Sequence, residues 1–270
     1  MSRSNPEIKL ESPCTRYFEW NGDAGGFKWY NKATKEKVAV PLPFTFIVLD
    51  CLVTISGFSD SQQSGFWSNE IKKKDIKNSI FKVRSKQGLN CEGTWEAIKG
   101  KETGMKYCES VYIAYVGDDK KLTIGNIKFM GAGLSPWINF CSGEKDDKGK
   151  KISEPNDPYV GAITVATMKE GKKGKTIYQM PVFTTKSLKP ETEEAVKEMD
   201  KQLQEYLIQY FAKNVLDTAV KETVTPTPEE VEATFHKTEE PSSQLSAKEV
   251  AMAKQEAKSN AIEEENDLPW

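Results

Sequence analysis

Hydrophobic and polar positions change their pattern near residue 190. Before that point, short runs of β-branched and aromatic residues alternate with turn residues, and this pattern predicts a mainly β body. The longest run, PFTFIVLDCLVTISGF at 43–58, is too long for one flat strand and suits a bent strand of a barrel. Further strands are predicted at residues 79–85, 93–99, 110–117, 121–131, 160–168 and 175–183, with a hairpin turn at 117–121 and an exposed loop at 141–158.

After residue 190 the apolar positions recur with a helical period. Pro190 and the acidic residues that follow it suit a helix N-terminus, so the pattern predicts an amphipathic helix over 190–222 that packs on the body or on another copy. Its apolar positions are Val196, Met199, Leu203, Leu207, Tyr210, Val215 and Ala219. TVTPTPEE at 223–230 then reads as a linker, and the polar remainder as a disordered tail. The predicted organisation is a body at 1–189, a helix at 190–222 and a tail at 223–270.

Charge divides at the same place. Residues 1–190 carry 30 basic and 21 acidic side chains, a difference of +9, whereas the remaining 80 residues carry 8 basic and 19 acidic ones, a difference of −11. A basic body attracts polyanions, and an acidic tail can compete for the same surface.

The sequence offers little for catalysis or for metal binding. The five cysteines are scattered and odd in number, which indicates reduced thiols, and His236 is the single histidine. The adjacent acid pairs at 118–119 and 146–147 lie in predicted turns, and no phosphate-binding glycine loop is present. We therefore expect no enzyme, no cofactor and no metal. Without an apolar signal region or membrane span, we expect a cytoplasmic protein with no membrane partner.

Nucleic-acid binding fits the body better. Five of the six tryptophans lie in the basic part, several of them beside lysines, as in FKWYNK at 27–32 and GFWSNEIKKK at 65–74. Aromatic rings stack on the bases of a single strand while lysine and arginine pair with its phosphates. In FKVRSK at 81–86, a strand would place Lys82, Arg84 and Lys86 on one face. An ordinary solvated face over a core, with most tryptophans buried, explains the same spacing and stays open.

The last residues combine acids with an apolar end. In EEENDLPW, the ring of Trp270 can fill an apolar pocket, its carboxylate can meet a basic residue, and the acids steer the encounter. This predicts a partner-docking tip made of Asp267, Leu268, Pro269 and Trp270.

EEENDLPW is similar to the acidic C-terminal tip of bacterial and phage single-stranded-DNA-binding proteins, with tryptophan in place of their terminal phenylalanine. The body resembles a family of phage proteins grouped with replication genes, through FEWNGDAGGFKWYNK, VPLPFTFIVLD, GFWSNEI and GAGLSPWINF. The resemblance implies an oligonucleotide-binding (OB-like) β-barrel that coats single-stranded DNA in the host bacterium's cytoplasm. Its tip would recruit replisome or recombination proteins, and its tail would weakly compete with DNA. The helix and the extra strands have no counterpart in the bacterial proteins.

The first hypothesis is therefore a non-enzymatic single-stranded-DNA-binding protein of phage replication or recombination. The alternatives are a structural or adaptor protein of phage assembly and an RNA-binding chaperone. The candidate stacking residues are Trp29, Tyr30, Phe66 and Trp67. The candidate phosphate contacts are Lys28, Lys72, Lys73, Lys74, Lys82, Arg84 and Lys86.

Overall fold

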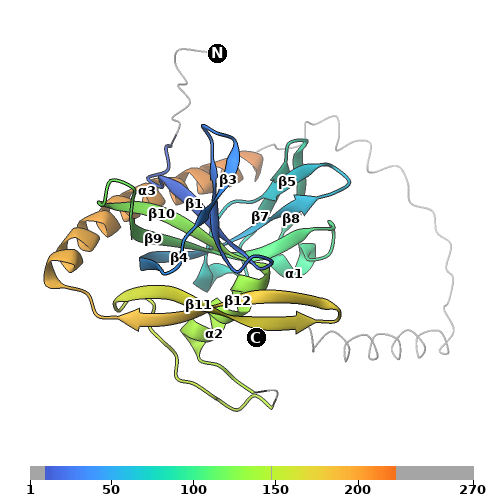
Figure 1. Ribbon diagram of the computed structural model, residues 1–270. Helices are drawn as coiled ribbons and strands as arrows, with labels where there is room; N and C mark the ends of the chain where they lie inside the picture. The colour runs from blue at the N-terminus through green and yellow to red at the C-terminus, as the bar shows by residue number, and fades with distance from the viewer. Residues whose placement is uncertain (1–9, 147, 223–270) are drawn as a thin grey trace, which may run out of the picture. The chain divides into compact units, whose positions relative to one another are not determined.

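The computed structural model describes residues 10–146 and 148–222. The chain separates into two units, Met1–Tyr210 and Phe211–Trp270, and the sheet belongs to the first. The strands are β1 (Arg16–Asn21), β2 (Gly26–Asn31), β3 (Glu36–Val40), β4 (Phe44–Ser59), β5 (Ser64–Trp67), β6 (Ile71–Lys72), β7 (Phe81–Ser85), β8 (Gly88–Gly93), β9 (Met105–Val116), β10 (Leu122–Phe129), β11 (Ala162–Lys173) and β12 (Thr176–Lys186). The helices are α1 (Trp95–Ile98), α2 (Leu134–Ser142) and α3 (Pro190–Glu222), with short 3₁₀ turns η1 (Lys73–Asp75) and η2 (Gly131–Gly133) (Figure 1).

The strands form one mixed, open sheet in the order β3-β2-β1-β10-β9-β4-β5-β7-β8. The β1–β10 pair is parallel and the other pairs are antiparallel. The long strand β4 organises the sheet, because β9 pairs with it from Phe46 to Gly57 while its other edge changes partner. β11 takes the first part of that edge, and β6 and β5 take the second.

A register irregularity between Val48 and Asp50 lies where β4 changes partner. Such a bulge bends a strand and increases its local twist, so it lets one strand serve two parts of a sheet. The mainly β body and the long strand predicted at 43–58 are confirmed. The barrel predicted for the body is present only as an open sheet, which runs from an edge at β3 to an edge at β8 without closing.

One face of the sheet, here called the core face, carries the two apolar clusters. Alternation along β9 directs Val111 and Ile113 into the first cluster, where α2 and the β11–β12 hairpin cover them through Trp137 and Phe183. Phe129 and Trp137 stack there with ring centroids 4.8 Å apart. The second cluster contains Val53, Ile55, Phe66, Ile71, Phe81, Val83, Ile98 and Tyr107.

The opposite face, here called the outer face, carries the residues of β9 that alternate with the core, such as Ser110 and Tyr112. The first part of α3 packs there, with Leu203 and Leu207 buried at 0% and 2% exposure. Gln204 Nε2 donates to Asp50 Oδ2 at 3.2 Å, and the Glu70 amide donates to the Tyr210 hydroxyl at 2.8 Å. The predicted helix is confirmed with its bounds, and up to Tyr210 it packs on the body.

Several local predictions succeed and others fail. β7, β9, β10, β11 and β12 lie where strands were predicted, and the turn at 117–121 closes with a bond from Gly117 N to Lys121 O of 2.8 Å. The strand predicted at 93–99 is wrong, because this segment forms the single turn α1 after Gly93, whose φ is +153°. α2 and the short strands β1, β2, β3, β5, β6 and β8 were missed. The predicted tail and tip lie outside the described residues.

Candidate nucleic-acid interface

Strand β7 sorts its residues as the sequence predicts. Phe81, Val83 and Ser85 are buried at 0%, 0% and 3% exposure, and Lys82 and Arg84 between them point to the outer face. Lys86 lies in the turn that follows β7 and is exposed. The alternation arises because β7 covers the second apolar cluster with one face only. The basic stripe predicted from FKVRSK is therefore present as a structural feature.

Strand pairing extends this stripe into a row across the outer face. Trp67 of β5 pairs with Arg84 of β7, and Arg84 pairs in turn with Leu89 of β8. On its other side Trp67 pairs with Ser56 of β4, which pairs with Lys106 of β9. Directly paired residues of antiparallel strands hold their Cβ atoms about 4.5–5.5 Å apart on one face. The five side chains thus form a continuous row.

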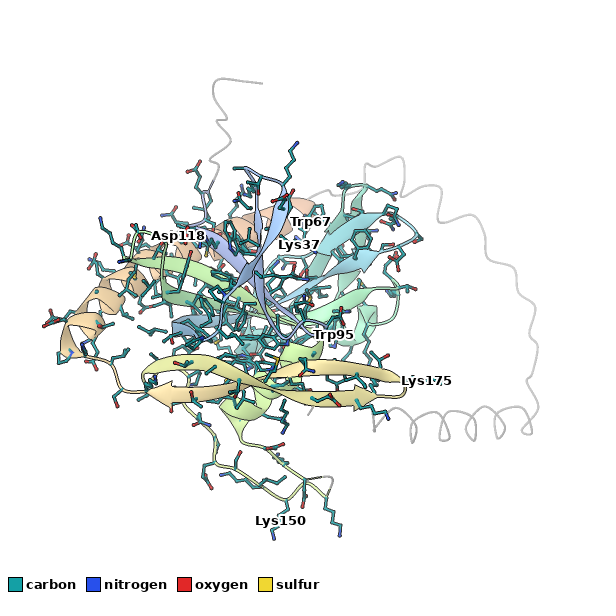
Figure 2. The ribbon with its side chains drawn as sticks, viewed as in Figure 1. Lys37, Trp67, Trp95, Asp118, Lys150 and Lys175 are labelled. Carbon is teal, nitrogen blue, oxygen red and sulfur yellow. The ribbon has the colours of Figure 1, made fainter. Side chains whose placement is uncertain are left out.

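Apolar and basic side chains are interleaved along this row and beside it. Trp67 is 44% exposed, Leu89 48%, and Phe58, two residues beyond Ser56 on β4, 50%. We call the whole set the Trp67 surface, and Figure 2 marks its central tryptophan. Its members are Phe58, Trp67, Lys82, Arg84, Lys86, Leu89 and Lys106. A tryptophan held this open between cations provides a stacking platform beside positive charge.

Several cations of the Trp67 surface have no carboxylate partner. Within residues 10–146 and 148–222, Arg84, Lys86 and Lys106 form no ion pair. Lys82 differs, since Glu92 of β8 lies directly opposite it in the register. The unpaired cations are therefore free to meet an external anion, such as a phosphate group.

The connector between β5 and β7 is fixed by hydrogen bonds. The side chain of Asn69 accepts a hydrogen bond from the Lys82 backbone N–H at 2.7 Å and donates one to the Ile80 carbonyl at 3.0 Å. The next residue, Glu70, accepts the hydroxyls of Ser110 at 2.5 Å and Tyr112 at 2.6 Å. Burial raises the pKa of Glu70, and these two hydrogen bonds offset part of that shift. The start of β7 is thereby tied to the centre of the sheet, which holds the Trp67 surface in place.

The prediction that Phe66 stacks on bases is corrected by its position in the structure. Its ring is 2% exposed and belongs to the second apolar cluster. Adjacent residues on a strand point to opposite faces, so Trp67 can lie outside only if Phe66 lies inside. Phe66 therefore supports the surface from beneath and does not face solvent.

The predicted residues on β2 form a separate group. Tyr30 is 53% exposed, whereas Trp29 packs against the first apolar cluster and carries the Arg16 guanidinium 4.1 Å above its ring centroid. Lys28 Nζ lies 3.9 Å from Glu19 Oε1. β1, β10, β9 and β4 separate β2 from β5 in the sheet. The structure therefore does not place this group beside Trp67.

The three consecutive lysines after β5 have different environments. Lys73 Nζ lies 2.6 Å from Glu109 Oε1, and that carboxylate is 2% exposed and also accepts the Trp137 indole N–H at 2.9 Å. Lys72 and Lys74 are exposed. Lys73 therefore compensates a buried charge, a role that its position in a run of lysines does not reveal.

The sequence reasoning missed Phe58, Leu89 and Lys106. Each belongs to the Trp67 surface only because of strand pairing, which is long-range for Lys106, and Leu89 lies on a strand that was not predicted. Of the other body tryptophans, Trp20 and Trp137 are buried at 6% and 0% exposure, and Trp95 is half-buried against Tyr107.

Searches against family models, curated proteins and solved structures returned no match. Across the described ranges, the longest helices are too short or too polar to cross a membrane. In the same ranges, histidine, cysteine, aspartate and glutamate side chains form no group of three or more that would suit a metal ion.

Proposed function

We propose that this chain binds single-stranded DNA, without catalysing a reaction, and that the Trp67 surface is the contact. The observation that carries the proposal is the row Lys106–Ser56–Trp67–Arg84–Leu89, in which an exposed indole lies between unpaired cations on one sheet face. Unstacked bases offer flat faces to the indole, and their phosphates match the cations on either side.

The form of the surface favours a single strand over a duplex. Trp67 presents apolar area between the cations of this set, and Phe58 and Leu89 add apolar area beside them. A duplex offers its phosphates but keeps its bases stacked inside, so apolar side chains on a sheet face gain nothing from it. A single strand can use both the cations and the apolar side chains.

The fold supports this proposal at the level of architecture. Oligonucleotide-binding folds are partly open barrels of antiparallel strands that bind their ligand on a sheet face. β4, β5, β7, β8 and β9 likewise form a continuous antiparallel set with the Trp67 surface across it. We further propose that the fold is OB-like and that the tip at 267–270 recruits replication or recombination proteins.

A titration with oligo-dT at low salt tests the proposal, with intrinsic tryptophan fluorescence as the readout. Trp67 is the most exposed of the body tryptophans, so we expect base stacking to quench the emission. The dissociation constant should be micromolar or tighter, and binding should weaken as salt rises. Absence of binding at low salt would refute the proposed function.

Parallel titrations identify the kind of nucleic acid. We expect a duplex of the same length to compete poorly, because it lacks accessible base faces. Oligo-U that binds ten times more tightly than oligo-dT would favour the RNA-binding alternative.

A further inference from the structure

The β11–β12 hairpin extends beyond the sheet as a two-stranded arm. β11 pairs with β4 only from Ala162 to Val165, and after an irregularity at Val165/Thr167 it pairs with β12 alone among the described strands. Its turn contains Gly174, whose φ is +60°. Figure 1 shows the hairpin as a long, twisted ribbon, and Figure 2 marks Lys175 at its end.

The arm is held in place by specific contacts with the β1–β2 turn. Gln179 donates its amide hydrogen to the Gly22 carbonyl at 2.6 Å, and its own carbonyl accepts the Trp20 indole N–H at 2.8 Å. The Met168 sulfur packs so closely on Gly25 that a Cβ atom there would lie 2.1 Å from it. The arm is therefore a positioned element with a fixed base.

The end of the arm is strongly basic. Lys169, Lys172, Lys173 and Lys175 are exposed and Glu170 is the one acid among them, which gives residues 169–175 a net charge of +3. None of these lysines forms an ion pair within the described ranges. Met168 and Ile177, at 40% and 55% exposure, add apolar surface beside them.

Lysines at an open strand edge also discourage pairing with another chain, and this role explains some of them. The loop at 141–158 offers an internal comparison, because Lys145, Lys148, Lys150 and Lys151 occur there with five acidic residues. The lysines of the loop are thus offset by acidic residues, whereas most lysines at the end of the arm are not. A sustained excess of cations on a rigid element favours a polyanionic ligand.

We infer that the β11–β12 arm is a second phosphate-contacting surface for single-stranded DNA. The inference rests on the proposed function and adds a site that lies away from Trp67. The arm packs over Trp20, a residue of the core-face cluster, whereas the Trp67 surface lies on the outer face. A strand that fits on the Trp67 surface does not reach the arm, and a longer strand contacts both.

The test compares two variants of the full chain with equal changes in charge. The arm variant replaces Lys169, Lys172, Lys173 and Lys175 with glutamine, and the loop variant replaces Lys145, Lys148, Lys150 and Lys151 with glutamine. Each is titrated with oligo-dT of about 10 and of about 40 nucleotides, because one oligonucleotide-binding domain covers roughly 4–16 nucleotides. Circular dichroism and thermal unfolding verify that both variants fold.

We expect the arm variant to bind the long oligonucleotide about tenfold or more weakly at about 0.1 M salt. Its plot of log K against log salt should be shallower by up to about 2.8, since each phosphate contact to a single strand contributes about 0.7. The short oligonucleotide should bind both variants like the unmodified chain, and the loop variant should bind both oligonucleotides unchanged.

Three results would overturn the inference. Equal affinity of the arm variant and the unmodified chain for the long oligonucleotide would assign the lysines to edge protection. An equal loss in the loop variant would reveal a nonspecific charge effect. Tighter binding by the arm variant would show that the arm lysines hinder the binding of DNA instead of contacting it. Failure of the proposed function looks different, because the unmodified chain would then bind neither oligonucleotide.

Discussion

β2 and β5 each present an exposed aromatic ring directly opposite a cation on the neighbouring strand. Tyr30 of β2 pairs with Lys37 of β3, and Trp67 of β5 pairs with Arg84 of β7. The two sites differ in what surrounds the cation. Glu19 of β1 lies 3.9 Å from Lys28 and 4.0 Å from Lys37, whereas Arg84 meets no carboxylate in the described ranges. The comparison shows that a strand pattern decides which face a lysine occupies, while the strands beside it decide whether its charge is available.

The largest expected effect is a loss of oligo-dT affinity when the ring of Trp67 is removed, with no comparable loss when the ring of Tyr30 is removed. Trp67→Ala should weaken oligo-dT binding by about 1–3 kcal/mol, or roughly 5- to 150-fold, because base stacking on an aromatic ring contributes that much. Tyr30→Ala is the matched control, since its ring is similarly exposed, and it should change the affinity less than twofold. Fluorescence anisotropy of labelled oligo-dT measures both, and equal losses would refute the distinction between the sites.

The second prediction separates a structural cation from the binding cations. Lys73→Ala should lower the free energy of unfolding by about 2–3 kcal/mol, because it leaves the carboxylate of Glu109 buried without its ion pair. The half-exposed position of Lys73 admits some water and keeps the loss below that of a fully buried pair. Lys74→Ala, at the exposed neighbour, should change stability by less than about 0.5 kcal/mol.

Urea unfolding of both variants measures the difference. The affinity of folded Lys73→Ala for oligo-dT should stay unchanged. A shallower salt dependence with unchanged stability would instead place Lys73 among the phosphate contacts.

The third prediction compares the two cations Arg84 and Lys28. Arg84→Gln should make the salt dependence of oligo-dT binding shallower by about 0.7, the contribution of one phosphate contact, and weaken binding a few-fold. Lys28→Gln should leave both quantities unchanged, because Glu19 already compensates that charge. Titrations at several salt concentrations compare the variants, and an effect of Lys28→Gln as large as that of Arg84→Gln would contradict the prediction.

These sites also show how far the sequence alone reaches. α3 and β4 were predictable because each has a long, uniform pattern in which local preference and burial agree. The alternation of β7 was predictable for the same reason. Phe66 and Trp67 are adjacent aromatic residues, and their sequence does not say which one faces inward. The answer depends on the pairing of β5 with β4 and β7, which joins residues far apart in the chain.

Short elements were the least predictable. α1 has four residues, so the cost of starting a helix is repaid by the burial of Ile98 and not by its own helical preference. β8 begins with glycine and contains polar residues, and it becomes a strand because β7 lies beside it. Lys106 and Leu89 enter the candidate site through such pairings, which a local pattern cannot reveal.

The smallest expected effect is the most direct test of what separates the two sites. Glu19→Gln removes the carboxylate near Lys28 and Lys37 and leaves Tyr30, with its exposed ring, beside two uncompensated cations. Both ion pairs are long and partly exposed, so the loss of stability should be below about 0.5 kcal/mol. Oligo-dT should bind about two- to threefold more tightly at low salt, with a salt dependence steeper by up to about 0.7. Unchanged affinity at low salt would show that Glu19 does not distinguish β2 from β5, and the difference would then lie in the indole of Trp67 and the apolar side chains around it.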